Sequence, residues 1–274
     1  EGTSTFGFQT ARHVGAQIVT SLLTDAQTTT RWFFVVAMGR KAGHLALGMG
    51  KAAGATLTLI GEEYAGRPLK AATVVDALAG AVLKRAALGL PHGVAVLAEG
   101  LVELLDEAEI AAMGNVERDA HGHIRIAEIP FGDIVKAQVQ RRLAEVGAAP
   151  VTIIAKNVGY ELRCVDPVPF DAEYTRELGY AAASFLLGGG SGAMVTVQGG
   201  KLAPKAFDDI LDPKTGRMRV RMVDAASDNL RVARAYMTRL LKSDLDDAAT
   251  LAKLAALTNL SPEAFKAAFA HVAA

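Results

Sequence analysis

A short turn containing two glycines and two cations is the segment of this sequence best suited to chemistry. Met38-Gly39-Arg40-Lys41-Ala42-Gly43 follows a strand-like run at 31–37 and precedes a helix-like stretch of small residues at 44–53. A helix that begins after such a turn offers N–H groups and a partial positive charge, which favour phosphate. Arg40 adds a permanently charged fork suited to phosphate oxygens. The turn predicts an anion site, although similar turns occur in folds that bind no ligand.

Other polar residues follow later apolar runs. In open α/β sheets, ligands bind at the carboxyl ends of the strands, where such residues would gather with Arg40. The residues at these predicted ends are Glu99, Lys156 and the segment Tyr160–Arg163. Arg31 lies at the opposite end of its own strand, from which it could reach a ligand bound by a neighbouring subunit.

Each of these side chains also has an ordinary structural interpretation. Loop arginines are mostly exposed to solvent, and a tyrosine such as Tyr160 is often half-buried. Glu99 suits the first turn of a helix, where acids are favoured. His121 and His123 lie in a polar stretch without a cysteine or carboxylate pattern, so a solvated loop is favoured over a metal site. No base is evident beside Cys164, which is therefore predicted to be inert.

The spacing of apolar residues predicts an α/β protein. Helices are predicted over 8–29, 44–53, 70–88, 101–112, 133–146, 171–187, 228–242, 246–257 and 261–272. Strands are predicted over 32–37, 55–60, 94–98, 151–155, 193–197 and 217–223. Strand–helix–strand units imply a mainly parallel sheet with right-handed crossovers. Residues 114–132, rich in Gly, Asn, Asp and His, are predicted to be an exposed insertion.

Composition narrows the class of protein. The chain has 274 residues, 51% hydrophobic and 21% charged, with 29 basic and 29 acidic residues. Zero net charge argues against a general nucleic-acid binder, and no apolar run is long enough for a membrane span. A single cysteine excludes an intramolecular disulfide and fits a reducing compartment, so a soluble, cytoplasmic protein is expected. The polar start at Glu1 indicates no signal peptide and suggests a processed or trimmed end.

Taken together, these segments resemble the 6-phosphofructokinase family. Met38-Gly39-Arg40 with Gly43 is similar to its Met-Gly-Arg sugar-phosphate signature. Gly159-Tyr160-Glu161-Leu162-Arg163, followed by Pro167–Asp171, is similar to its second sugar-phosphate segment. Gly7–Ala11 resembles the helix after its catalytic loop. Tyr160 stands where the ATP-dependent bacterial enzymes usually carry histidine, and this form resembles the pyrophosphate-dependent branch.

The resemblance implies a Rossmann-like three-layer sheet of the phosphofructokinase fold, with extra C-terminal helices. Residues 1–163 would form the sugar-phosphate-binding portion, with the insertion at about 114–132. Residues 164–242 would form the remaining α/β portion and would pack on an N-terminal lobe. Residues 243–274 would form the C-terminal helices.

The implied reaction is transfer of a phosphoryl group from pyrophosphate to the 1-hydroxyl of fructose 6-phosphate, a step of glycolysis that uses Mg²⁺. Arg40 would be catalytic and would stabilise charge on the transferring group. Glu99 and the backbone of Met38 and Gly39 would hold the sugar.

The same resemblance assigns the 6-phosphate to Arg163, Tyr160 and Arg31, with Glu161 and Leu162 in the same substrate segment. Arg31 would be lent across a subunit interface, which requires at least a dimer. A second such arginine of the family falls at Ile154. Lys156, two residues on and on the same strand face, could replace it.

Three family motifs have no counterpart in these residues. They are the glycine-rich phosphate loop, the Gly-Gly-Asp-Asp donor site and the Thr-Ile-Asp-Asn-Asp catalytic segment. The ligands of Mg²⁺ and the catalytic base are therefore expected upstream, and the chain alone is expected to be inactive. Thr56 replaces an acid of the allosteric enzymes, which weakens the case for nucleotide regulation. The alternatives are an ATP-dependent enzyme, a non-catalytic sugar-phosphate-binding subunit, and a related kinase of the same fold acting on a lipid or nucleotide.

Overall fold

The computed structural model describes residues 4–66, 69–112, 129–218 and 220–274. The chain forms two compact units. The sheet unit comprises Gly15–Gly159 and Met222–Ala274, and the hairpin unit comprises Glu1–Val14 and Tyr160–Arg221. The division by role at 163 and 242 stays a prediction, since these units are defined by compactness.

The sheet unit is built on a four-stranded parallel sheet in the order β2-β3-β1-β4. Both β1 and β3 are buried along their whole length, as expected for strands covered on two faces. The predicted parallel sheet is confirmed. The strands are β1 (Trp32–Ala37), β2 (Leu57–Leu59), β3 (Gly93–Ala98) and β4 (Ile153–Val158).

The strand register decides which residues share an edge of the sheet. Ala37, the last residue of β1, lies opposite Ala98 of β3 and Val158 of β4. The next residue, Met38, donates its backbone N–H to the carbonyl of Val158 at 3.0 Å. The loops that follow β1, β3 and β4 therefore start at the same edge.

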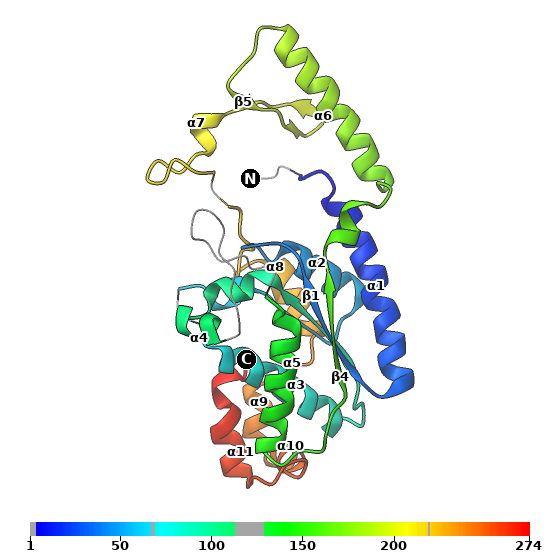
Figure 1. Cartoon of the computed structure of the whole chain (residues 1–274), viewed down its shortest axis with the longest axis vertical. Helices are drawn as coiled ribbons and strands as arrows, with labels where there is room; N and C mark the ends of the chain where they lie inside the picture. The colour runs from blue at the N-terminus through cyan, green and yellow to red at the C-terminus, as the bar shows by residue number, and fades with distance from the viewer. Residues whose placement is uncertain (1–3, 67–68, 113–128, 219) are drawn as a thin grey trace. The chain divides into compact units, whose positions relative to one another are not determined.

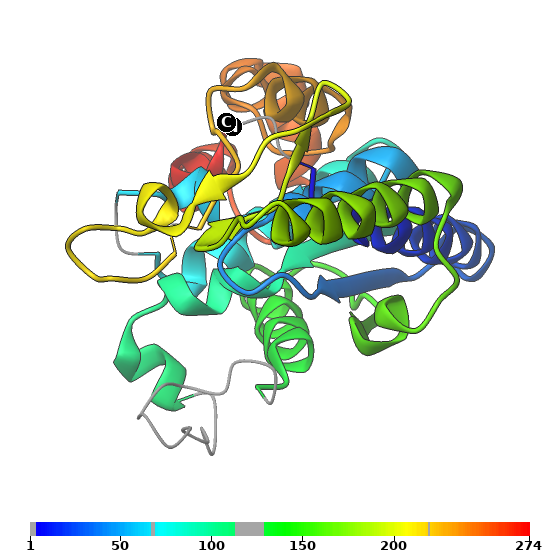
Figure 2. The same cartoon turned by 90° about the horizontal axis from the view of Figure 1, so that it is seen from above.

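Helices cover the two faces of this sheet (Figures 1 and 2). On one face, α2 packs on β2 and β3, while α3 and α5 pack together on the other. Small residues let α2 approach closely: a Cβ added at Gly50 would lie 2.2 Å from Oγ1 of Thr58. The helices are α1 (Phe8–Thr29), α2 (His44–Ala53), α3 (Ala71–Ala87) and α5 (Phe131–Glu145).

The C-terminal segment closes the α3 side of the core. Phe265 and Phe269 are fully buried in the same cluster as the α3 residues. Lys84 of α3 donates to Asp244 at 2.6 Å. The predicted C-terminal helices are confirmed, although they are shorter than predicted. They are α8 (Asp228–Tyr236), α9 (Lys242–Asp246), α10 (Ala248–Ala255), α11 (Pro262–Phe269) and η5 (Ala270–Val272).

Some predicted elements differ from the structure. The helix predicted at 101–112 is two pieces, η2 (Glu99–Leu104) and α4 (Glu107–Ala112), and η1 (Gly61–Tyr64) follows β2. The strand predicted at 217–223 is wrong: among the described residues there, only Met218 forms a bridge, with Leu211. Its alternating apolar side chains are exposed and do not face a core. Most of the insertion predicted at 114–132, namely residues 114–128, lies outside the described residues.

The hairpin unit contains one long helix and two small antiparallel pairs. These elements are η4 (Tyr160–Arg163), α6 (Pro169–Leu187), α7 (Phe207–Ile210), and the pairs β5 (Ala193–Met194) with β8 (Lys205–Ala206) and β6 (Val197–Gln198) with β7 (Lys201–Leu202). Within the part of the chain that the structure describes, no helix is both long and apolar enough to cross a membrane.

A buried aspartate organises this unit. Asp171 accepts the backbone N–H groups of Gly7 and Thr10 at 2.9 and 2.7 Å, and the Thr10 hydroxyl at 2.6 Å. Val168 donates its N–H to Thr10 Oγ1 at 3.1 Å. A carboxylate is favoured at a helix N-terminus, so Asp171 fixes the start of α1. It also joins the Gly7–Ala11 and Pro167–Asp171 segments, which sequence reasoning had singled out separately.

Gly100, at the start of η2, allows that helix to lie directly against the loop after β1. A Cβ added at Gly100 would lie 2.2 Å from the backbone oxygen of Arg40 and 3.0 Å from that of Lys41. Neither backbone oxygen can move away by a change of rotamer, as the end of a flexible side chain could. A residue larger than glycine must therefore displace the loop.

We predict that Gly100→Ala lowers the free energy of unfolding by about 1–3 kcal/mol, the usual cost of overpacking. Gly179→Ala is the matched control, because a Cβ added at Gly179 in α6 meets no atom within 4 Å. That control should stabilise the protein by up to about 1 kcal/mol through helix propensity. Urea denaturation of both variants tests this, and equal stability of Gly100→Ala and the wild type would contradict the close approach.

Candidate functional site

The loop between β1 and α2 has the geometry of a tight turn. Arg40 has a φ of +48°, in the left-handed region that few residues other than glycine adopt. Ala42 donates its N–H to the carbonyl of Gly39 at 3.3 Å, and Gly43 is the N-cap of α2. Both Gly39 and Arg40 are exposed. The turn therefore presents Arg40 from an exposed backbone held in an unusual conformation.

Glu99 binds this turn directly. Its Oε2 accepts the backbone N–H groups of Gly39 and Arg40 at 3.0 and 3.1 Å. The structure thus brings together two segments that lie 60 residues apart in the chain, as the common strand edge predicts. Although Glu99 begins η2, its side chain crosses to the turn.

This contact corrects one sequence-based expectation. The turn was predicted to offer backbone N–H groups to a phosphate, yet those of Gly39 and Arg40 are bound by Glu99. The Gly43 N–H is bound by Glu62 at 2.9 Å. At these three positions the backbone N–H groups already donate to acids of the same chain. A phosphate would therefore be held chiefly by side-chain cations.

Charges of both signs surround Arg40. Lys41 Nζ lies 3.9 Å from Oε2 of Glu103, which also belongs to η2. Burial raises the pKa of the Glu103 carboxyl and Glu99 raises it further, while Lys41 and Arg40 act to lower the pKa. Glu99, Glu103, Arg40 and Lys41 thus form one mixed charge cluster, in which the cations are balanced locally.

Sequence reasoning missed Glu62, although the rule that found Glu99 could have found it. Glu62 lies in η1, at the carboxyl end of β2, and its side chain is buried. Besides the Gly43 N–H, its Oε1 accepts the Val223 N–H at 2.9 Å. Two acids from neighbouring strand ends therefore hold the turn.

Lys156 does not lie at a strand end, as the sequence had suggested. The strand predicted at 151–155 runs instead from Ile153 to Val158, and Lys156 pairs with Val35 inside it. Because β4 is an edge strand, its polar residues can face solvent, and Lys156 is exposed. Its position two residues from Ile154, on the same face of the strand, agrees with the prediction.

The second predicted substrate segment forms η4 of the hairpin unit. Tyr160 is 73% exposed, so it is not the half-buried tyrosine of the alternative interpretation. The Arg163 guanidinium carbon lies 5.2 Å from the centre of the Tyr160 ring, a cation–π arrangement that orients both side chains. Leu162 is buried and anchors this turn, whereas Glu161 is exposed.

Arg31 precedes β1, at the edge of the sheet opposite the turn. Its carbonyl accepts the N–H of Gly93, the first residue of β3. A six-residue strand separates Arg31 from Met38, which corresponds to about 20 Å. Arg31 therefore cannot act on a ligand at the Arg40 turn of its own chain.

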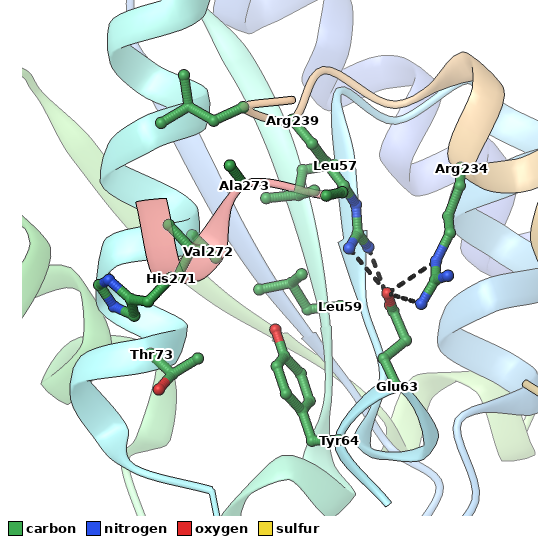
Figure 3. Close-up of a pocket in the computed structure, with 13 residues that line it drawn as sticks. Leu57, Leu59, Glu63, Tyr64, Thr73, Arg234, Arg239, His271, Val272 and Ala273 are labelled. Atoms are coloured by element: carbon green, nitrogen blue, oxygen red, sulfur yellow. Dashed lines mark hydrogen bonds and ion pairs between the residues drawn. The ribbon is translucent and has the colours of Figure 1, made fainter. Parts of the chain in front are cut away.

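The sheet unit also contains a cavity of about 260 Å³ away from this turn (Figure 3). In it Glu63, adjacent to Glu62, lies between the guanidinium groups of Arg234 and Arg239, at 2.8 Å from each. The Glu63 side chain is only 3% exposed. These three residues form an ion-pair cluster around a buried carboxylate, which sequence reasoning did not predict.

Three other sequence candidates add little to the site. Cys164 is an exposed free thiol, and His121 and His123 lie outside the described residues. Within residues 4–66, 69–112, 129–218 and 220–274, no group of three His, Cys, Asp or Glu side chains is placed to hold a metal ion.

Several known proteins are similar to this chain. It is 51% identical over 276 residues to the pyrophosphate–fructose 6-phosphate 1-phosphotransferase of Thermotoga maritima and 46% identical over 282 residues to that of Naegleria fowleri. Each match covers 99% of this chain, but only 65% and 64% of those relatives. The chain thus spans somewhat less than two thirds of their length.

Solved structures agree on the fold. Phosphofructokinase from Saccharomyces cerevisiae matches 98% of this chain and 28% of that chain, with a TM-score of 0.54 at 17% identity. Phosphofructokinase from Pichia pastoris in the T-state matches 93% of this chain and 25% of that chain, with a TM-score of 0.51 at 19% identity. Both support the three-layer fold expected from the sequence.

The family model described as Phosphofructokinase matches residues 1–186, which include the Arg40 turn, Glu99 and the Tyr160–Arg163 segment. The chain therefore belongs to the phosphofructokinase family.

Proposed function

We propose that this chain supplies the sugar-phosphate site of a pyrophosphate-dependent 6-phosphofructokinase. The reaction is transfer of a phosphoryl group from pyrophosphate to the 1-hydroxyl of fructose 6-phosphate. Two relatives that match nearly the whole chain are named for this activity. The Gly159–Arg163 segment resembles that of the pyrophosphate-dependent branch.

The observation that carries the proposal is the contact of Glu99 with the turn. It fixes the backbone of Gly39 and Arg40 beside a carboxylate that can accept hydrogen bonds from sugar hydroxyl groups. Met38 and Gly39 contribute the adjoining backbone. This combination suits a polyhydroxylated substrate better than a bare phosphate, because the backbone N–H groups already have partners.

The cations have separate roles in this proposal. Arg163, oriented by Tyr160, binds the 6-phosphate, for which a guanidinium fork is well suited. Arg40 stabilises the charge that develops on the transferring group, since electrostatic positioning dominates phosphoryl transfer. Glu161 and Leu162 belong to the same substrate segment.

The interface residues complete the substrate site from a second subunit. Arg31 reaches the 6-phosphate bound by a neighbouring copy, so the active assembly is at least a dimer. Lys156, exposed on β4, takes the place of the arginine that other family members lend across the interface. A cytoplasmic location fits this role in glycolysis.

The Mg²⁺ ligands and the catalytic base are assigned by family resemblance alone. Among the described residues, no group of three His, Cys, Asp or Glu side chains is placed to hold a metal ion, and no step is assigned to the metal. The proposal places the Mg²⁺ ligands and the base upstream in the family's chain order. The chain alone is therefore predicted to have no phosphofructokinase activity. Phosphorylation of fructose 6-phosphate by this polypeptide, with pyrophosphate or ATP as donor, would contradict this assignment.

We predict that the chain binds fructose 6-phosphate and that Arg163→Ala weakens this binding by about tenfold or more, because a charge-assisted contact to phosphate is lost. Isothermal titration calorimetry measures the affinity. Arg176→Ala is the control, since Arg176 is an exposed arginine on α6 of the same unit. Equal affinity of the Arg163→Ala and Arg176→Ala variants would remove Arg163 from the site, and no binding by the wild type would contradict the proposed function.

We predict a different result for Arg40→Ala. If Arg40 acts on the transferring group, its loss changes the affinity for fructose 6-phosphate by less than about threefold, because transition-state contacts contribute little to ground-state binding. The same titration tests this. A loss as large as that of Arg163→Ala would show that Arg40 holds the substrate.

A further inference from the structure

Glu62 is a buried acid that the reaction as described above does not use. It is only 4% exposed, and its Oε1 accepts two backbone N–H groups, from Gly43 and Val223, each at 2.9 Å. Among the described residues, its Oε2 has no hydrogen-bond partner. A buried carboxylate with an unpaired oxygen costs free energy, so its presence calls for a compensating role.

The surroundings of Glu62 explain why position 43 is a glycine. A Cβ added there would lie 2.8 Å from Oε2 of Glu62 and 2.5 Å from Cβ of Ile60. The Glu62 carboxylate therefore packs against the backbone of the first residue before α2. At that point it also lies at the positive end of the helix dipole, which favours a negative charge.

Glu62 and Glu99 hold opposite ends of the same turn. Glu99 binds the N–H groups of Gly39 and Arg40, and Glu62 binds that of Gly43. Between them Arg40 is kept in a left-handed conformation that costs about 1–2 kcal/mol for a residue with a Cβ. With one end released, the turn can relax toward ordinary backbone conformations, and Arg40 then moves.

The second N–H bound by Glu62 connects the turn to a distant part of the chain. The chain returns to the sheet unit at Met222, and Val223 is the next residue. The chain leaves that unit after Gly159, whose neighbour Val158 accepts the N–H of Met38. The departing and returning segments are thus both tied to the turn, one at Met38 and the other through Glu62.

We infer that Glu62 is a positioning residue of the sugar-phosphate site. The two hydrogen bonds accepted by its Oε1 fix the Gly43 end of the turn and the returning segment at Val223. This inference rests on the proposed function. It assigns no contact between Glu62 and the substrate. The expected effect of Glu62 is on the placement of the Gly39–Arg40 backbone and Glu99, and hence on sugar binding.

Glu63 provides a matched control for the experiment. It is the next residue and its side chain is also buried, but it pairs with Arg234 and Arg239 in the cavity and not with the turn (Figure 3). Its removal also destabilises the protein, because it leaves Arg239, whose side chain is 15% exposed, and Arg234 without their carboxylate. A comparison of Glu62 and Glu63 variants therefore distinguishes an effect of lost stability from an effect of lost positioning.

Calorimetric titration of fructose 6-phosphate into four variants tests the inference. Glu62→Ala should weaken binding by about tenfold, the equivalent of one strong hydrogen bond. Glu62→Gln keeps a carbonyl oxygen for both N–H groups and should stay within about threefold of the wild type. Glu62→Asp, one methylene shorter, should fold yet bind more weakly. Glu63→Ala should lower the melting temperature and keep the affinity within about threefold.

Two outcomes would overturn the inference. One is wild-type affinity in a folded Glu62→Ala variant or, should that variant not fold, in Glu62→Asp. The other is an equal loss of affinity in Glu63→Ala, which would assign the effect to stability alone.

Hydrogen exchange separates this inference from the proposed function. Whether or not fructose 6-phosphate binds, Glu62→Ala or Glu62→Asp should speed exchange of the Gly43 and Val223 amides, while Glu63→Ala should leave them protected. No binding by the wild type together with this exchange pattern would refute the proposed function and preserve the positioning role. Unchanged exchange at both amides would refute the positioning role itself.

Discussion

One carboxylate bound to two consecutive backbone N–H groups organises the candidate site. Glu99 accepts from Gly39 and Arg40, and Arg40 is held there in a left-handed conformation. The contact is possible because β1 and β3 end in register and because Gly100 lets η2 approach the turn. Together with the contact of Glu62 at Gly43, this interaction offsets the conformational cost at Arg40.

This constraint decides what the site can recognise. Since the turn's N–H groups at 39, 40 and 43 are bound by acids of the same chain, negative charge would be recognised chiefly by side-chain cations. Glu99 remains able to accept further hydrogen bonds, because a carboxylate has about four acceptor positions. A hydroxyl-rich sugar that also carries a phosphate matches this combination of acceptors and cations.

Much of the fold could be predicted from the sequence, because short apolar runs rich in β-branched or aromatic residues, such as 32–37 and 94–98, favour buried strands. The meeting of Arg40 with Glu99 followed from the same pattern. Lys156 was placed wrongly because an edge strand tolerates polar residues, so the apolar run ended before the strand did. Glu62 follows β2 as Glu99 follows β3, so the same rule applied to the strand predicted at 55–60 could have found it, but its burial and its bonds to Gly43 and Val223 depend on the folded backbone.

The most direct test of the account is the response of the Gly39 and Arg40 backbone amides to fructose 6-phosphate, followed by nuclear magnetic resonance during a titration. The account predicts saturable shifts of both amide signals with a common affinity, because the sugar engages the carboxylate that holds them. Binding without any change at these two amides, with shifts confined to residues around the Glu63 cavity, would contradict it.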